Sequence, residues 1–210
     1  MFHNDEINYE SKLTEEVIRN NFKIVAEMEA VASLKEKILD KYYGNTTNQL
    51  KECFHNFGKE VLTEYGVVFL SNKAAKSINN HRFNELKAWG IGAIKQVLEN
   101  GKALFYRTNY KKENKNRLFI VAPVVILEGK YIGHYMMGVA VDISQTTNRV
   151  QLIELVLNKE GESYGTTIGK KPTHGVEDSP STITLLQQVI AVKNGTLDLD
   201  QVTAIGIDSE

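Results

Sequence analysis

The residues best suited to chemistry form one basic, aromatic segment between positions 102 and 117. Its cations and aromatic rings are Lys102, Phe105, Tyr106, Arg107, Tyr110, Lys111, Lys112, Lys115 and Arg117. Cationic side chains bind phosphates, and aromatic rings stack on unpaired bases. The segment therefore predicts contact with single-stranded nucleic acid. The alternative interpretation is that residues 111–116 form a solvated turn between two strands.

Two further side chains are candidates for proton transfer. His81 lies beside Arg82 where a helical pattern breaks, and Glu154 stands alone in an apolar run. Histidine and glutamate are common general acids and bases. The alternatives are a helix cap or packed surface histidine for His81 and an exposed strand face for Glu154. His134, inside another apolar run, is a weaker candidate of the same kind.

The sequence lacks the motifs of several large enzyme classes. It has no phosphate-binding glycine loop, no dinucleotide fingerprint, no paired-histidine zinc helix and no serine-hydrolase elbow. Its single cysteine, Cys53, has no cysteine partner for a disulfide or a metal site. We therefore expect no metal and no cofactor. The start of the chain, Met1-Phe2-His3-Asn4, is neither basic nor apolar, which predicts a cytoplasmic protein with no membrane partner.

Charge is distributed unevenly along the 210 residues. The net charge is −3 over residues 1–60, +7 over residues 61–171 and −5 over residues 172–210. A basic middle between acidic ends favours contact between the middle and a polyanion such as RNA. Solvated surface charge is the simpler explanation.

Helical periodicity dominates the first hundred residues. Apolar positions every three to five residues predict a helix from Thr14 to about Tyr43, with Ser11 or Thr14 as its N-cap. A shorter helix is expected within residues 45–65. A short strand follows at Val67–Leu70, and two helices fill residues 71–100, with Asn100-Gly101 as a C-terminal cap.

The pattern then changes to runs rich in β-branched and aromatic residues. These predict strands at residues 103–108, 118–127, 131–143, 150–157 and 163–168, with a tight turn at Glu128-Gly129-Lys130. Pro123 cannot donate a ladder hydrogen bond, so its strand is expected to be an edge or to carry a bulge there. After a linker, residues 181–193 predict a short helix.

Helices followed by a meander predict the α+β class, with a four- to five-stranded antiparallel sheet and helices on one face. We divide the chain into an N-terminal helical region (1–65), an α+β core (66–168) and a linker with a short helix and an acidic tail (169–210).

Part of the predicted core resembles a phage family. The stretches that carry the resemblance are Gly66–Ser71, Ala74–Ile78, Ile94–Gly101, Ile120–Val124, Glu128–Gly133, Gly138–Val141 and Asn148–Leu155. They are similar to the large polyvalent protein-associated domains of phages, which are often fused to head-morphogenesis proteins of the MuF type. The resemblance covers roughly residues 66–160.

The resemblance implies the fold of the barnase, EndoU, colicin and RelE nuclease superfamily. It implies a metal-independent endoribonuclease or toxin of a phage or mobile element, acting in a bacterial host. The catalytic set would be His81, Arg107, Arg117, Glu154 and Tyr164, since related folds place a phenol on the last strand. Where the family has a His-Gly pair after its first helix, this chain has Asn79-Asn80-His81-Arg82.

A non-catalytic module is the competing expectation. In that case the sheet carries a degenerate active site, and the N-terminal helices bind a phage or host protein or form a homodimer. An RNA-binding module without chemistry is the third alternative.

Overall fold

The computed structural model describes residues 12–38, 46–80, 84–108, 110, 114–145, 147, 150–160 and 182–202. The helices in these segments are α2 (Glu15–Glu27), α3 (Thr46–Asn56), α4 (Asn72–Asn80), α5 (Glu85–Gly90), α6 (Ile94–Asn100) and α7 (Thr182–Lys193), with short 3-10 turns η1 (Ile91–Ala93) and η3 (Leu199–Gln201). The strands are β1 (Ala32–Leu34), β2 (Glu60–Thr63), β3 (Gly66–Phe69), β4 (Lys102–Arg107), β5 (Lys115–Glu128), β6 (Tyr131–Ser144) and β7 (Val150–Lys159).

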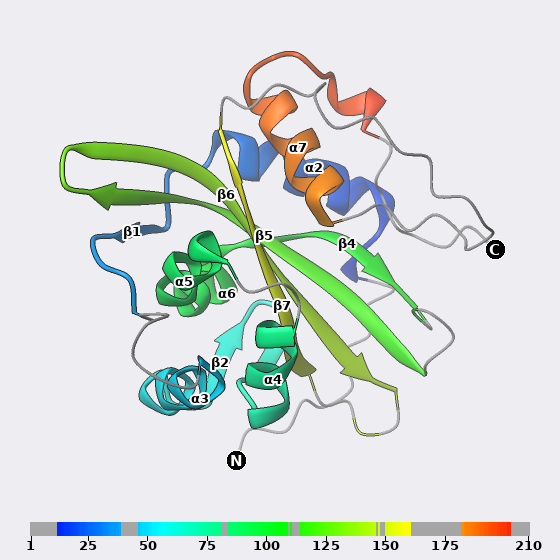
Figure 1. Ribbon diagram of the computed structural model, residues 1–210. Coiled ribbons are helices and arrows are strands. Elements are labelled where there is room, and N and C mark those ends of the chain that lie inside the picture. The colour runs from blue at the N-terminus through cyan, green and yellow to red at the C-terminus, as the bar shows by residue number, and fades with distance from the viewer. Residues whose placement is uncertain are drawn as a thin grey trace, which may run out of the picture.

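The strands form one mixed sheet, so the predicted α+β class is confirmed (Figure 1). Its order is β1-β5-β6-β7-β3-β2. β4 pairs with the same edge of β5 as β1 does, but nearer the start of β5. The pairs β1–β5 and β3–β7 are parallel, and the other pairs are antiparallel. The prediction of a four- to five-stranded antiparallel sheet was therefore wrong in strand number and in order. Residues 163–168, the last predicted strand, lie outside the described residues.

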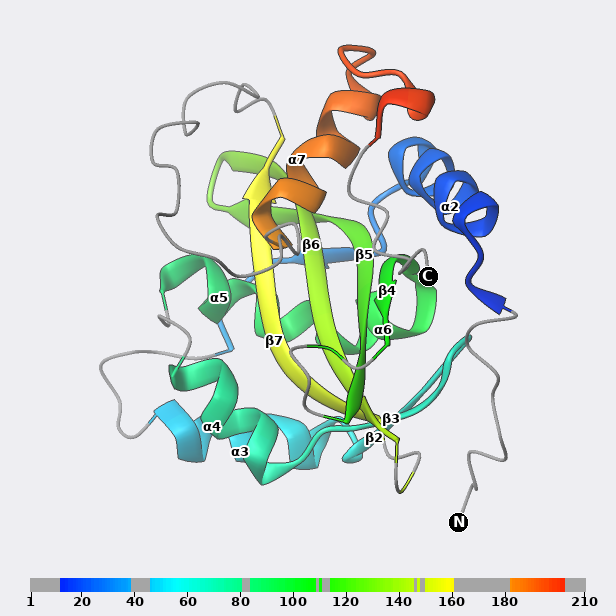
Figure 2. The same cartoon turned by 90° about the vertical axis from the view of Figure 1, so that its right-hand side faces the viewer.

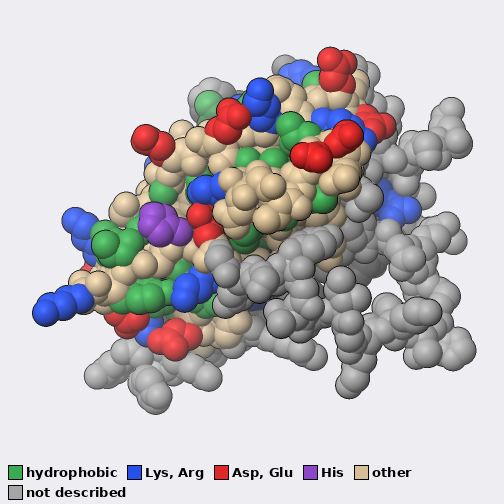
Figure 3. All heavy atoms as spheres, turned by 90° about the horizontal axis from the view of Figure 1, so that it is seen from above, with side chains coloured by type: hydrophobic (Ala, Val, Ile, Leu, Met, Phe, Trp, Pro, Cys, Tyr) green, Lys and Arg blue, Asp and Glu red, His purple; other side chains and the backbone are tan. Residues whose placement is uncertain are grey.

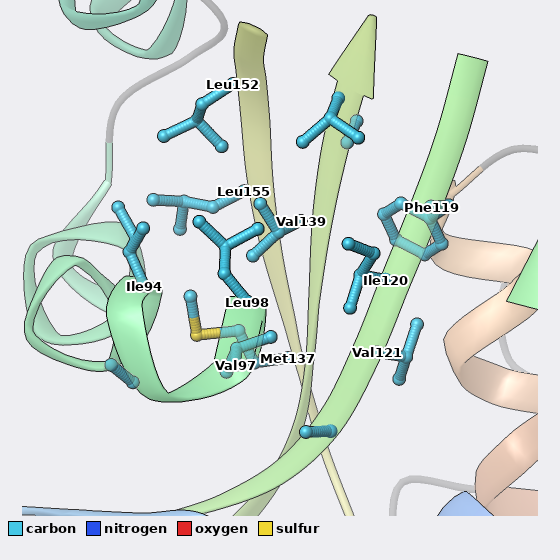
Figure 4. Packing of buried hydrophobic residues seen from close by; sticks show 14 of the residues in the cluster. Ile94, Val97, Leu98, Phe119, Ile120, Val121, Met137, Val139, Leu152 and Leu155 are labelled. Carbon is cyan, nitrogen blue, oxygen red and sulfur yellow. The ribbon is translucent and has the colours of Figure 1, made fainter. Parts of the chain in front are cut away.

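Helices cover both faces of the sheet, not one as predicted. Figure 2 shows α7 in front of the sheet with α2 beside it, and α6 behind. The central strands are apolar on both sides: residues 118–122 of β5 and 135–143 of β6 are buried, apart from Asp142 all apolar or glycine. Unbroken apolar runs are typical of strands that are covered on both faces. In Figure 4, Ile94 and Leu98 of α6 face Val139 and Leu155, whereas Phe119 points to the other face.

The first helix begins as predicted and ends earlier. The side chain of Thr14 accepts a hydrogen bond from the backbone of Val17, which confirms the N-cap. The helix stops at Glu27 instead of continuing to Tyr43. The next residues have helix-compatible types, but Val31 donates a backbone hydrogen bond to Pro123 and β1 adds to β5. Tertiary pairing therefore outweighs local helical propensity here.

The apolar face of α2 packs on the core. Ile18, Phe22 and Val25 are buried in a hydrophobic cluster that extends from Leu13 to Val202. We expected this face to pack either on the chain's own core or on a second chain, and the described helix uses its own core.

The second predicted helix is also shorter than expected. α3 ends at Asn56, and the following residues form β2, which pairs with the predicted strand β3. Lys59 and Gly58 have positive φ angles of 62° and 94° just before β2. Such angles are incompatible with a continuing helix. The Asn100-Gly101 cap and the Gly129 turn, with a φ of +60°, are both as predicted.

Pro123 lies at a gap between two partner strands. β6 pairs with β5 along its whole length, so the edge that was expected at Pro123 can only lie on the other side of the strand. On its other side, pairing with β4 ends at Val121 and pairing with β1 begins at Val124. A proline, which has no N–H to donate, is tolerated where neither strand needs one.

Side chains complete the hydrogen bonds at the outer edge of β4. The Tyr65 hydroxyl accepts a hydrogen bond from the backbone N–H of Ala103 (2.8 Å), and Asn21 donates to the Ala103 carbonyl (2.9 Å). Burial raises the pKa of the Tyr65 phenol from 10.0 to about 12, although the bond from Ala103 acts in the opposite direction.

This raised pKa predicts a loss of stability at alkaline pH. The unfolded phenol ionises near pH 10, whereas the folded phenol stays neutral until about 12. The contribution is therefore complete below pH 10 and is lost as the pH rises from 10 to 12, by about 1.4 kcal/mol per pH unit. Urea unfolding at pH 8, 10 and 11 should show a steeper decline for the parent than for Tyr65→Phe. Equal slopes would contradict the assignment.

Candidate functional site

Three charged side chains form a row across one end of the sheet. Arg107 of β4 is the register partner of Arg117 in β5, and Arg117 is the partner of Asp142 in β6. Directly opposite residues project from the same face and interact through their side chains. Lys115 lies two residues before Arg117 and shares this face. In Figure 2 the lower ends of β5 and β6 extend past α2 and α7 at this end.

Arg117 and Asp142 form a bidentate ion pair. Nε and Nη2 of Arg117 donate to the two carboxylate oxygens of Asp142 at 2.6 and 3.0 Å. The Tyr110 ring lies over the guanidinium, with 4.1 Å between the Arg117 Cζ and the ring centroid. Burial by itself lowers the pKa of Arg117, but hydrogen bonds and charge from Asp142 and Tyr110 outweigh it and raise the pKa. The guanidinium is thus fixed in plane and permanently charged.

We define the Arg117 cluster as Arg107, Tyr110, Lys115, Arg117 and Asp142. Its three cations and one carboxylate leave a net positive charge, and an aromatic ring lies among them. Arg107, Tyr110 and Lys115 are all partly exposed. Such a set can bind a phosphate and stack on a base.

Tyr106 faces the other side of the sheet. Tyr106 and Arg107 are adjacent in the strand and so project from opposite faces. Tyr106 is 4% exposed, and its hydroxyl accepts a hydrogen bond from Asn116 (3.0 Å). Asn116 in turn accepts one from Gln145 (2.8 Å). Tyr106 therefore stabilises the hairpin end, and its ring is buried within the sheet.

Lys102 lies at the far end of β4 from Arg107. Its ammonium group is 2.6 Å from a carboxylate oxygen of Glu64, in the turn between β2 and β3. The sequence placed Lys102 in the same basic segment as Arg107, but the two side chains lie at opposite ends of β4.

Glu154 is paired with a lysine on a different element. It lies opposite Ala140 where the β6–β7 register shifts, and its carboxylate is 3.6 Å from the ammonium group of Lys87 in α5. The Lys87 side chain is 8% exposed, and burial lowers its pKa despite the charge of Glu154. Glu154 and Arg117 thus have separate charge partners, Lys87 in helix α5 and Asp142 in strand β6.

The remaining predicted residues fall in other parts of the chain. His81, Lys111, Lys112 and Tyr164 lie outside the described residues. His134 is exposed near the turn between β5 and β6. Cys53 is buried, and burial raises the pKa of its thiol, which makes it a structural residue.

Asp142 is the site residue that the sequence reasoning missed. It interrupts the apolar run Val139-Ala140-Val141-Asp142-Ile143, the same signal that singled out Glu154. A charge in a two-sided buried strand needs a partner, and Arg117 supplies one. Lys87 gave no comparable signal, because a lysine in an amphipathic helix is ordinary.

Metal sites and membrane-spanning helices are both lacking over the described ranges. No group of three or more histidine, cysteine, aspartate or glutamate side chains there could hold a metal ion. None of the helices there is both long and apolar enough to cross a bilayer.

Comparisons of this chain with protein-family models, with curated proteins and with solved structures gave no match.

Proposed function

We propose that the protein is a non-catalytic module that binds single-stranded RNA through the Arg117 cluster. The observation that carries this proposal is the Tyr110 ring stacked on Arg117 at 4.1 Å, on the face shared with Arg107 and Lys115. Arginine side chains beside an aromatic ring can bind one nucleotide, because the cations contact its phosphate and the ring stacks on its base. The surrounding segment, residues 61–171, carries a net charge of +7, which adds long-range attraction for a polyanion.

The pairing of the acid–base candidate favours binding over cleavage. Metal-independent cleavage requires a base close to the cations that hold the phosphate. Glu154 pairs with Lys87, and Arg117 pairs with Asp142. Each charge therefore has a structural role that a catalytic cycle would have to interrupt.

Ribonuclease activity is the second candidate. It rests on the resemblance to phage domains of the barnase-like superfamily and on Arg107 and Arg117, which lie side by side on adjacent strands. Two adjacent guanidinium groups can hold a phosphorane. A phage or mobile-element origin and a bacterial cytoplasm are proposals that follow from the same resemblance.

RNA binding is tested with a fluorescein-labelled 12-nucleotide single-stranded RNA, measured by anisotropy from 50 to 200 mM salt. Arg107→Ala and Lys115→Ala should each weaken binding about tenfold. Each should also lower the slope of log affinity against log salt by about 0.7, the value for one phosphate contact on a single strand. Lys76→Ala on α4, an exposed lysine on a different element, is the matched control and should leave both quantities unchanged.

The same samples separate binding from cleavage. Gel analysis of the RNA after incubation in EDTA should show intact strands for the parent. Cleavage by the parent that His81→Ala abolishes would support the ribonuclease instead. Neither binding nor cleavage at 50 mM salt would rule out both nucleic-acid functions. Binding with equal salt slopes for all variants would place the RNA site away from the Arg117 cluster.

A further inference from the structure

The hairpin between β5 and β6 projects from the opposite end of the sheet. Figure 1 shows it extending beyond the helices and the other strands. We call residues 127–134 the hairpin tip. The two strands stay paired up to Glu128 and Tyr131, and Gly129 and Lys130 form the turn between them. Along β5 the tip is roughly 40 Å from Arg117, from the rise per residue of a strand.

The hairpin tip exposes large apolar side chains. Ile132 is 63% exposed and Tyr131 is 42% exposed, whereas the described parts of β5 and β6 between residues 118 and 143 are otherwise mostly buried. Figure 3 shows apolar side chains at this end of the molecule, next to cationic side chains and a histidine. Exposed apolar groups at a protruding point mark an interaction surface.

The backbone of β6 continues past its partner here. The pairing with β7 ends at Tyr135 and Lys159, followed by one further bond from the Glu160 N–H to the His134 carbonyl (2.9 Å). Because polar groups alternate along a strand, the N–H and C=O of Ile132 point to the same edge as those of His134. No described strand pairs with Ile132 at this edge. Such an edge is a template for an added strand.

The charge around this edge is positive. Lys159 lies 5.5 Å from the centre of the Tyr131 ring, and Lys130 and His134 are exposed. Two described carboxylates lie beside them. Glu160, which follows β7, is neutralised by Lys193 at 2.9 Å, and the exposed Glu128, the register partner of Tyr131, offsets one of the two lysines. The Tyr131 and Tyr135 hydroxyl oxygens are 3.3 Å apart, and this hydrogen bond together with Lys159 lowers the pKa of Tyr131, whereas the charge of Glu128 acts in the opposite direction.

We propose that the hairpin tip docks an acidic, extended segment of another protein, which adds a strand to β6 at Ile132. Backbone hydrogen bonds would give affinity, as in other cases of strand addition. Ile132 supplies an apolar contact, and Lys130 and Lys159 select acidic side chains. The site is independent of the Arg117 cluster, so RNA and a protein segment could be bound at once.

The probe is a fluorescein-labelled peptide, Glu-Val-Glu-Ile-Glu-Val-Glu-Thr, with a second peptide in which lysine replaces each glutamate. The acidic peptide should bind the parent, and the basic one should bind at least tenfold more weakly. Ile132→Pro, which removes the outward N–H, and Lys159→Glu should each weaken binding of the acidic peptide at least tenfold. Hydrogen exchange of the Ile132 amide should slow when the acidic peptide is bound.

The matched control is Leu62→Ser, which removes another exposed apolar side chain, 68% exposed, from strand β2. It should leave peptide binding unchanged. Circular dichroism checks that Ile132→Pro folds. Ile132→Ser is a second variant, which removes the apolar side chain but keeps the backbone N–H. Equal binding of the two peptides, or binding that survives both Ile132 substitutions, would overturn the proposal. So would a doubled mass in light scattering that Ile132→Pro abolishes, because the edge would then pair with a second copy.

Discussion

Replacing Asp142 with alanine is expected to lower the free energy of unfolding by about 3 to 5 kcal/mol, the usual cost of removing one partner of a buried ion pair. The Arg117 and Asp142 side chains are only 18% and 11% exposed. Without Asp142, the guanidinium would lose both hydrogen bonds and stay in a poorly solvated position beneath Tyr110. Urea denaturation at pH 7 measures the change.

A double variant shows whether the loss comes from the orphaned charge. Arg117→Met with Asp142→Leu keeps the volume apolar and should be within about 1 kcal/mol of the parent, since apolar replacements of buried pairs are often neutral. Glu99→Ala, which breaks the exposed Lys95–Glu99 pair, should cost less than about 0.5 kcal/mol. An Asp142→Ala cost below about 1 kcal/mol would show that Arg117 is solvated in solution.

The long strands were predictable because their residues are unambiguous. Residues 118–127 and 131–143 are rich in β-branched and aromatic types, and Glu128-Gly129-Lys130 can only close a hairpin there. The same runs also contained the signal for helices on both faces, because they are apolar without alternation. Reading them as one-sided strands led to the error.

β1 could not be predicted from local sequence. It has three residues, its neighbours favour a helix, and its partner β5 lies about ninety positions later in the chain. Short strands of this kind form because a preorganised edge offers hydrogen bonds, and a single sequence does not show that edge. The unpredicted strands β1 and β2, and the pairing of the predicted strand β3 with β7, account for the difference between the predicted and observed sheets.

The candidate site was predictable in composition and not in geometry. The alternation of a strand places Lys115 and Arg117 on one face, which the sequence shows. That Arg107 joins them while Tyr106 faces away depends on the register of β4 with β5, which shifts between Ala103 and Phe105. The pairing of Arg117 with Asp142 depends on a second register, that of β5 with β6.

Replacing Gly138 with alanine is expected to lower the free energy of unfolding by about 3 kcal/mol, at the upper end of the range for overpacked cores. Gly138 of β6 lies beneath the Phe119 ring of β5, and a β-carbon there would fall within 2.7 Å of Cε1 and Cε2 and closer still to Cζ. Phe119 is 1% exposed, so the ring has no open space to move into.

The test of this packing is a double-mutant cycle measured by urea denaturation. Phe119→Leu alone should be destabilising, but combined with Gly138→Ala it should give a favourable coupling energy of at least about 1 kcal/mol, because the smaller side chain makes room for the new methyl group. Gly92→Ala is the matched control: its methyl group would meet only the ends of the Ile38 and Leu34 side chains, at 3.1 Å. It should change stability by less than about 1 kcal/mol. Additive effects of the two core substitutions would contradict a direct contact between Phe119 and Gly138 and would place the two strands in a different register.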